Sequence, residues 1–223
     1  MNILRLLALV SSLTLACLAV HAELPATIIT PALQLMPGKN DAAWQPLLTA
    51  LKAKAPIMAT FEERRYFPFK KNPVVLTGEI RLDPQRGLSL HYQVPEERIL
   101  VVDDRGGFMR DGKGRRLHDL PDDPRAQAAT RALLHVMRFE LSALAQDFSI
   151  YASRDGADWR FAFVPLPGGP LVDVLQPITV TGKDELVTGI EMKKSEDQRV
   201  EIHIGETHTN VTFNSTELTR FFR

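Results

Sequence analysis

The strongest constraint on the fold is an alternation of apolar and polar residues in two neighbouring segments, 74–82 and 88–94. Successive side chains of a β-strand point to opposite faces, so each segment predicts a strand with one apolar and one polar face. The connection at residues 83–87 contains Pro84 and Gly87, which favours an antiparallel hairpin. The apolar parity is held by Val74, Leu76, Gly78, Ile80, Leu82, Leu88, Leu90, Tyr92 and Val94.

Further segments with strand character lie on both sides of this hairpin. Residues 57–66 predict a strand, and the charged run at 62–65 within it is interpreted as a solvated strand face. Residues 99–102 are apolar on both faces, which is typical of a central strand. Phe148 and Ile150 share a parity in one later segment, as do Trp159, Phe161 and Phe163 in the next. More strands are predicted at 108–110, 115–120, 178–181, 186–193, 199–204 and 210–213.

Few helices are predicted. Asn40 or Asp41 can cap a helix that ends at about Ala55, before Pro56. Asp123 and Pro124 start a second helix, a short one follows at 140–145, and another is expected at residues 218–222. The apolar stripes of the first two helices are Trp44, Leu47, Leu48 and Leu51, and Ala129, Leu133, Val136 and Met137.

These elements predict a mainly β (α+β) fold. Many one-sided strands form a strongly curved antiparallel sheet, or incomplete β-barrel, whose apolar face must be covered by another layer. A few short helices can cover such a face only in part, so an apolar cavity is expected between the helices and the sheet.

The first 22 residues predict a cleaved signal peptide. Arg5 is followed by an apolar run that is too short to span a bilayer, and Val20-His21-Ala22 is a small-residue cleavage site. The alternative is a lipid anchor at Cys17, but the preceding Thr14-Leu15-Ala16 matches a lipoprotein signal poorly. Cleavage after Ala22 leaves an exported single domain, 23–223. That domain has no cysteine and therefore no thiol chemistry.

Charge and motifs argue against several function classes. The chain has 27 basic and 27 acidic residues, and removal of residues 1–22 leaves 26 against 27, so a nucleic-acid partner is not expected. A G-x-S-x-G nucleophile motif does not occur in the sequence, and the spacing of His203 and His208 does not suit two metal ligands on one strand face. We therefore expect a protein that is not an enzyme and that has no metal site and no cofactor.

The order of motifs resembles the opening of the LolA-type periplasmic lipoprotein carriers. It is carried by Phe61-Glu62-Glu63, Gly78-Glu79-Ile80, Pro84, Leu88-Ser89-Leu90, Pro95 and the strand Ile99-Leu100-Val101-Val102-Asp103. Residues 141–167 are similar to a divergent branch of the family that is associated with lipid exporters. The chain departs from the family pattern at Glu63 in place of Gln, Tyr92 in place of Trp, Asp83 in place of a basic residue, and the loosened Asp-Gly at 103–106.

The resemblance implies a monomeric, non-enzymatic carrier. It would bind acyl chains of a lipid or lipoprotein beneath a helical lid at about 124–145. It would pass them from an inner-membrane exporter or donor complex to an outer-membrane acceptor. A hydrolase of lipid or glycan and a structural envelope module with a solid core are the alternative functions. Permanent packing of the helix on the sheet is the alternative to a lid. The expected cavity residues are Leu76, Ile80, Leu90, Tyr92, Val101, Leu133, Met137, Phe148, Trp159, Phe161 and Phe163.

Overall fold

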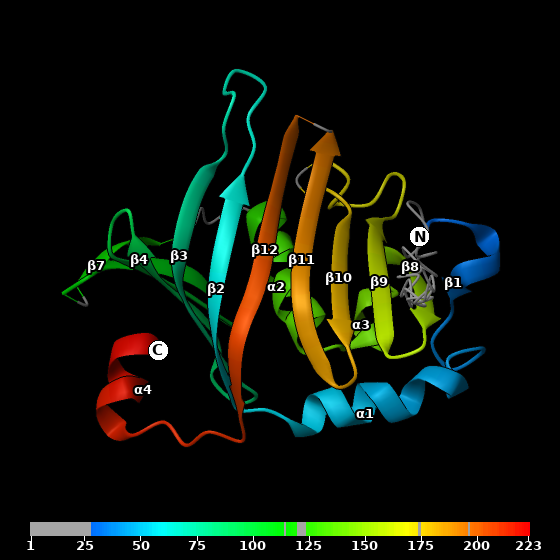
Figure 1. Ribbon diagram of the computed structural model, residues 1–223, viewed down its shortest axis with the longest axis horizontal. Coiled ribbons are helices and arrows are strands. Elements are labelled where there is room, and N and C mark those ends of the chain that lie inside the picture. Colours follow the sequence, from blue (N-terminus) through cyan, green and yellow to red (C-terminus); the bar gives the residue numbers. More distant parts are fainter. Residues whose placement is uncertain (1–27, 114, 120–123, 174, 196) are drawn as a thin grey trace, which may run out of the picture.

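A computed structural model of the chain describes residues 28–113, 115–119, 124–173, 175–195 and 197–223, so the predicted signal peptide lies outside the described residues. The fold is one twelve-stranded antiparallel sheet with the order β1-β8-β9-β10-β11-β12-β2-β3-β4-β5-β6-β7 (Figure 1). The sheet is not closed, because β1 and β7 are unpaired edges in that order. The predicted open antiparallel sheet with few short helices is confirmed.

The strands and helices have the following bounds. The strands are β1 Gln34–Leu35, β2 Ile57–Arg65, β3 Val74–Asp83, β4 Gly87–Val94, β5 Arg98–Asp103, β6 Gly106–Asp111, β7 Arg116–Asp119, β8 Phe148–Asp155, β9 Asp158–Pro165, β10 Ile178–Lys183, β11 Leu186–Ser195 and β12 Gln198–Thr209. The α-helices are α1 Gln45–Ala53, α2 Pro124–Met137, α3 Leu141–Leu144 and α4 Ser215–Phe221, and short 3-10 turns lie at Pro31–Leu33 and Ala42–Trp44.

The predicted hairpin is confirmed as β3 and β4, with Ile80 opposite Leu90. Asp83 fixes its turn, because one side-chain oxygen accepts hydrogen bonds from the backbone N–H groups of Gln85 (2.8 Å) and Arg86 (3.0 Å). Gly87 then takes a φ of +102°, a conformation that only glycine adopts without strain.

The strand predicted at 210–213 is wrong. Strand β12 runs on to Thr209, and Asn210 then takes a left-handed φ of +54°, which ends the ladder. The chain next turns toward α4, whose first turn is closed by a capping box between Asn214 and Glu217. The residues read as a short strand are therefore the connection to the last helix.

One face of the sheet, called here the inner face, carries a continuous row of side chains. Cross-strand neighbours in this row are Ala152, Phe161, Val180, Ile190 and Ile202, one from each of β8 to β12. Helices α1, α2 and α3 cover this face; Figure 1 shows α1 along one end of the strands and α2 and α3 behind them. Most of the apolar core lies between these helices and the sheet.

The opposite face, called here the outer face, is covered locally by α4. Ile99 and Val101 of β5 and Phe108 of β6 form a separate apolar cluster with Phe221 and Phe222. Leu100 and Val102 lie on the inner face, because neighbouring residues in a strand alternate. The strand that reads as apolar on both sides is thus covered on both sides, as the sequence predicted.

The interpretation of the charged run in β2 as a solvated face needs correction. Glu63 is only 3% exposed, because Phe61, Glu63 and Arg65 share the parity that faces inward. Its carboxylate pairs with Arg65 and accepts a hydrogen bond from the Tyr92 hydroxyl at 2.9 Å. Glu62 and Arg64 do form an exposed ion pair on the other face, at 2.7 Å.

Candidate functional site

Ten of the eleven sequence-predicted cavity residues lie on the inner face of the sheet or on the helix that covers it. They fall into two adjoining clusters, which share Met137 and Ile202 as neighbours. Val101 is the exception, since it lies on the outer face against α4. Leu76, Ile80, Leu90, Tyr92 and Leu133 belong to one cluster, Phe148, Trp159, Phe161 and Phe163 to the other, and Met137 contacts both.

The four aromatic residues on β8 and β9 form solid core and do not border open space. Trp159, Phe161 and Phe163 are completely buried. Phe161 makes edge-on ring contacts with Trp44 (4.9 Å between ring centroids) and Phe139 (6.0 Å). Such packing is typical of protein interiors, which have few voids larger than a water molecule. These residues therefore form the packed core beside the site.

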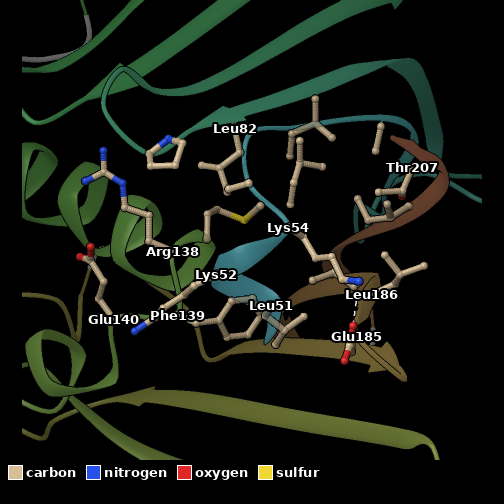
Figure 2. Close-up of a pocket in the computed structure, with 18 residues that line it drawn as sticks. Leu51, Lys52, Lys54, Leu82, Arg138, Phe139, Glu140, Glu185, Leu186 and Thr207 are labelled. Carbon is tan, nitrogen blue, oxygen red and sulfur yellow. Dashed lines mark ion pairs between the residues drawn. The ribbon is translucent and has the colours of Figure 1, made fainter. Parts of the chain in front are cut away.

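Open space remains beside this core, in an apolar cavity of about 270 Å³. Its floor is the inner face of β2, β3 and β12, and its walls are the end of α1, the α2–α3 turn and the β10–β11 turn (Figure 2). Of the predicted residues only Ile80 and Met137 line it. The apolar lining includes Leu51, Ala59, Ile80, Met137, Phe139 and Leu186.

The α2–α3 turn forms one wall through an unusual backbone conformation. Phe139 has a φ of +51°, which is rare for a bulky residue and costs on the order of 1–3 kcal/mol. Burial against Trp159 and Phe161 offsets this cost, with ring centroids 5.9 and 6.0 Å away. The ring contacts therefore hold the turn at the edge of the cavity.

Charged side chains form the rim of the cavity. Lys54 pairs with Glu185 at 2.7 Å on one side of the cavity, while Arg138 and Glu140 lie on the other side (Figure 2). Arg138 pairs with Asp104 at 3.0 Å, and Glu140 pairs with His135. An apolar interior with a charged rim suits a molecule that has an apolar chain and a polar end.

A polar group interrupts the inner face at the other end of β2. The hydroxyl of Tyr92 donates to Glu63, whose second oxygen binds Arg65. Burial raises the pKa of Tyr92, and the negative charge of Glu63 raises that pKa further. Tyr92 therefore stays protonated and serves as a hydrogen-bond donor on this face.

Two further observations concern the described residues only. Their His, Cys, Asp and Glu side chains do not gather in any group of three or more that could hold a metal ion. In the same part of the chain, we find no helix with the length and apolar character needed to cross a membrane.

Comparisons with known proteins give structural likeness but no sequence relative. No protein-family model matches the chain, and the search of curated proteins found no match. Similar solved structures include LolA superfamily protein NE2245 from Nitrosomonas europaea, with 7% identity over 78% of this chain and 96% of that chain and a TM-score of 0.43. LprF from Mycobacterium bovis has 13% identity over 78% and 96% of the two chains and a TM-score of 0.36.

MucB of Pseudomonas aeruginosa, solved together with MucA, is also similar, with 16% identity over 79% of this chain and a TM-score of 0.40. This chain spans 59% of that MucB chain. A LolA superfamily protein is thus among the solved structures that this chain resembles. Similarity of this degree concerns the fold alone and gives no information about a ligand.

Proposed function

We propose that this protein is a non-enzymatic carrier that binds an acyl chain of a lipid or lipoprotein in the cavity between α1, the α2–α3 turn and the sheet. The observation that carries the proposal is the apolar space of about 270 Å³, lined by residues such as Leu51, Ile80 and Phe139 and bordered by charged side chains. An acyl chain fits the interior, and a polar headgroup can stay at the rim.

The volume of the cavity favours one acyl chain over several. A water molecule occupies about 30 Å³ in the liquid. If a methylene group needs the same volume, the cavity of about 270 Å³ takes roughly nine carbons. At ~0.8 kcal/mol per buried CH₂, nine carbons contribute about 7 kcal/mol as an upper bound. That free energy corresponds to a Kd of about ten micromolar, which allows both uptake and release.

In this proposal the chain is exported through the signal at residues 1–22 and works in the periplasm. It receives its ligand from an exporter or donor complex in the inner membrane and gives it to an acceptor at the outer membrane. A carrier without a membrane anchor can diffuse between the two membranes.

Filling the cavity should abolish this binding. Ala59 is buried, faces inward from β2 and lines the cavity, so Ala59→Phe places a ring in the space that the acyl chain needs. We expect at least tenfold weaker binding of a fluorescent fatty-acid probe, measured by fluorescence titration. The matched control is Thr60→Phe, which adds the same ring to the exposed side of the same strand and should leave the probe affinity within twofold. Equal affinities for the two variants would place the ligand elsewhere.

The helical segment 124–145 is proposed to act as a lid over this region. Leu133 is half-buried and packs on the cluster above β2 to β5, whereas Leu134 beside it is 1% exposed. Leu133→Asp should lower probe uptake at least tenfold while the β-type circular dichroism is kept, because the helix can stay folded when its contact with the sheet weakens. Leu134→Asp should unfold the protein, since it buries an unpaired charge. If Leu133→Asp also unfolds the protein, the helix is permanent core and the lid hypothesis fails.

A further inference from the structure

A second hollow lies on the outer face, between β6, the start of β7 and α4. The sheet separates it from the cavity on the inner face. This second hollow is an open groove of about 740 Å³. No acidic residue lines this groove within the described part of the chain, while five cationic side chains do: Arg110, Lys113, Arg116, Arg220 and Arg223. Three hydroxyl side chains of α4 and the ring of Phe108 also line it.

Three of the guanidinium groups surround one buried ring. The Cζ atoms of Arg110, Arg116 and Arg223 lie 5.1, 4.6 and 4.7 Å from the centroid of Phe108. The faces of an aromatic ring attract cations but do not neutralise their charge. Burial lowers the pKa of Arg110, and repulsion from Arg116 and Arg223 lowers it further. The three positive charges therefore lie close enough to repel one another.

Nearby groups hold three of the cations in place. Arg110 donates hydrogen bonds to the backbone carbonyls of Thr219 (2.6 Å), Arg220 (2.8 Å) and Phe222 (3.1 Å). Outside the lining, Glu97 pairs with Arg220 and Asp103 with Arg223, both at 2.8 Å. Arg220 and Arg223 thus have carboxylate partners, and backbone carbonyls hold Arg110 in the groove.

We propose that this groove binds phosphate groups, and that their source is the headgroup layer of an anionic phospholipid membrane. Guanidinium groups match phosphate oxygens in charge and in geometry, and the hydroxyl groups of α4 add donors. The cations converge on one concave groove with room for more than a single phosphate, as a phosphoglycerol headgroup requires. Because the whole chain has a formal net charge of +0, attraction to an anionic membrane must come from a local patch of this kind.

The test compares two double variants of the full chain in co-sedimentation with vesicles. Lys113 and Arg116 are exposed, and Lys113→Gln with Arg116→Gln removes two charges from the groove. Near a membrane surface each cation is worth about a fivefold change in affinity, so about 25-fold weaker binding to phosphatidylglycerol vesicles is expected. The control, Lys70→Gln with Lys71→Gln, removes the same charge from the exposed β2–β3 loop and should change binding by less than twofold. Phosphatidylcholine vesicles should not bind any variant.

Other results would overturn the proposal. Equal losses in both double variants would mean that net charge alone drives binding. Binding of glycerol phosphate without vesicle binding would keep the phosphate chemistry and reject the membrane as its source. A polyglutamate peptide that binds the groove while vesicles do not would assign it to an acidic protein. A further test needs no variant. When the soluble headgroup of the vesicle lipid is added to the protein with its own sequence, the amide NMR signals of α4 and β6 must shift.

Discussion

Gly182→Ala should destabilise the protein by about 3 kcal/mol or more, because the new methyl group meets atoms that cannot move away. A Cβ at position 182 would lie 2.0 Å from Cζ2 and 2.3 Å from Cε2 of Trp159, and 2.4 Å from the backbone oxygen of Leu186. The indole is 0% exposed, and its Nε1 donates a hydrogen bond to the carbonyl of Asp184 at 2.8 Å. Denaturant unfolding followed by circular dichroism measures the change.

Gly189→Ala in the neighbouring strand is the matched control. The closest atom to its new Cβ would be the hydroxyl oxygen of Thr181, at 2.9 Å, and the next is the backbone oxygen of Ile202, at 3.4 Å. A small shift of the Thr181 side chain relieves this contact, so the loss should stay below about 1 kcal/mol. Similar losses for the two variants would show that the indole of Trp159 can shift and that the core on β9 is not rigid.

The sequence predicted most strands because alternation is a local property of the chain. Trp159, Phe161 and Phe163 share a parity that can be read without any partner strand, and the structure places all three on one face. The contact between Trp159 and Gly182 could not be predicted, since it depends on the register of β9 and β10. The strand expected at 210–213 failed for a related reason: the backbone N–H groups of Asn210 and Val211 donate to the carbonyls of Lys54 and Pro56, which are distant in the sequence.

The cavity was predicted as a feature, but most of its residues were not. The position of a residue in the alternating pattern of a strand predicts the face on which its side chain lies. It does not predict which part of that face a helix will cover. Ile80 lines the cavity, while Phe161 on the same face is covered by Trp44, just before α1, and by Phe139 of the α2–α3 turn. Phe139 gave no signal in the sequence, since its role depends on a left-handed backbone conformation between two helices.

Two misplaced residues did carry a usable signal. Val101 has the opposite parity to Leu100, so only one of the two can face the cavity, and the structure gives that face to Leu100. Glu63 shares the parity of Phe61, which already placed it on the apolar face. A buried carboxylate needs partners, and the hydroxyl of Tyr92 supplies one of them from a strand that is distant in the sequence.

Phe222→Ala should cost about 3–5 kcal/mol of stability, the usual range for a large side chain removed from a core. The ring is 0% exposed and packs in the outer cluster with Ile99 and Phe108, and its centroid lies 5.4 Å from that of Phe213. Its carbonyl accepts a hydrogen bond from Arg110 at 3.1 Å, which holds the end of α4 against β6. Loss of the ring therefore removes both the apolar contact and the support for that hydrogen bond.

Phe69→Ala is the control with the same chemical change, since Phe69 is 79% exposed in the β2–β3 loop and its loss should change the free energy of unfolding by less than about 0.5 kcal/mol. Denaturant unfolding also separates two ways in which Phe222→Ala can act. If the outer cluster is part of the global core, the midpoint falls and the slope with denaturant stays the same. If α4 opens on its own, amide hydrogen exchange rises in α4 and β6 while the midpoint hardly moves. The second outcome would contradict the prediction, because it would make α4 an attachment that the sheet does not need.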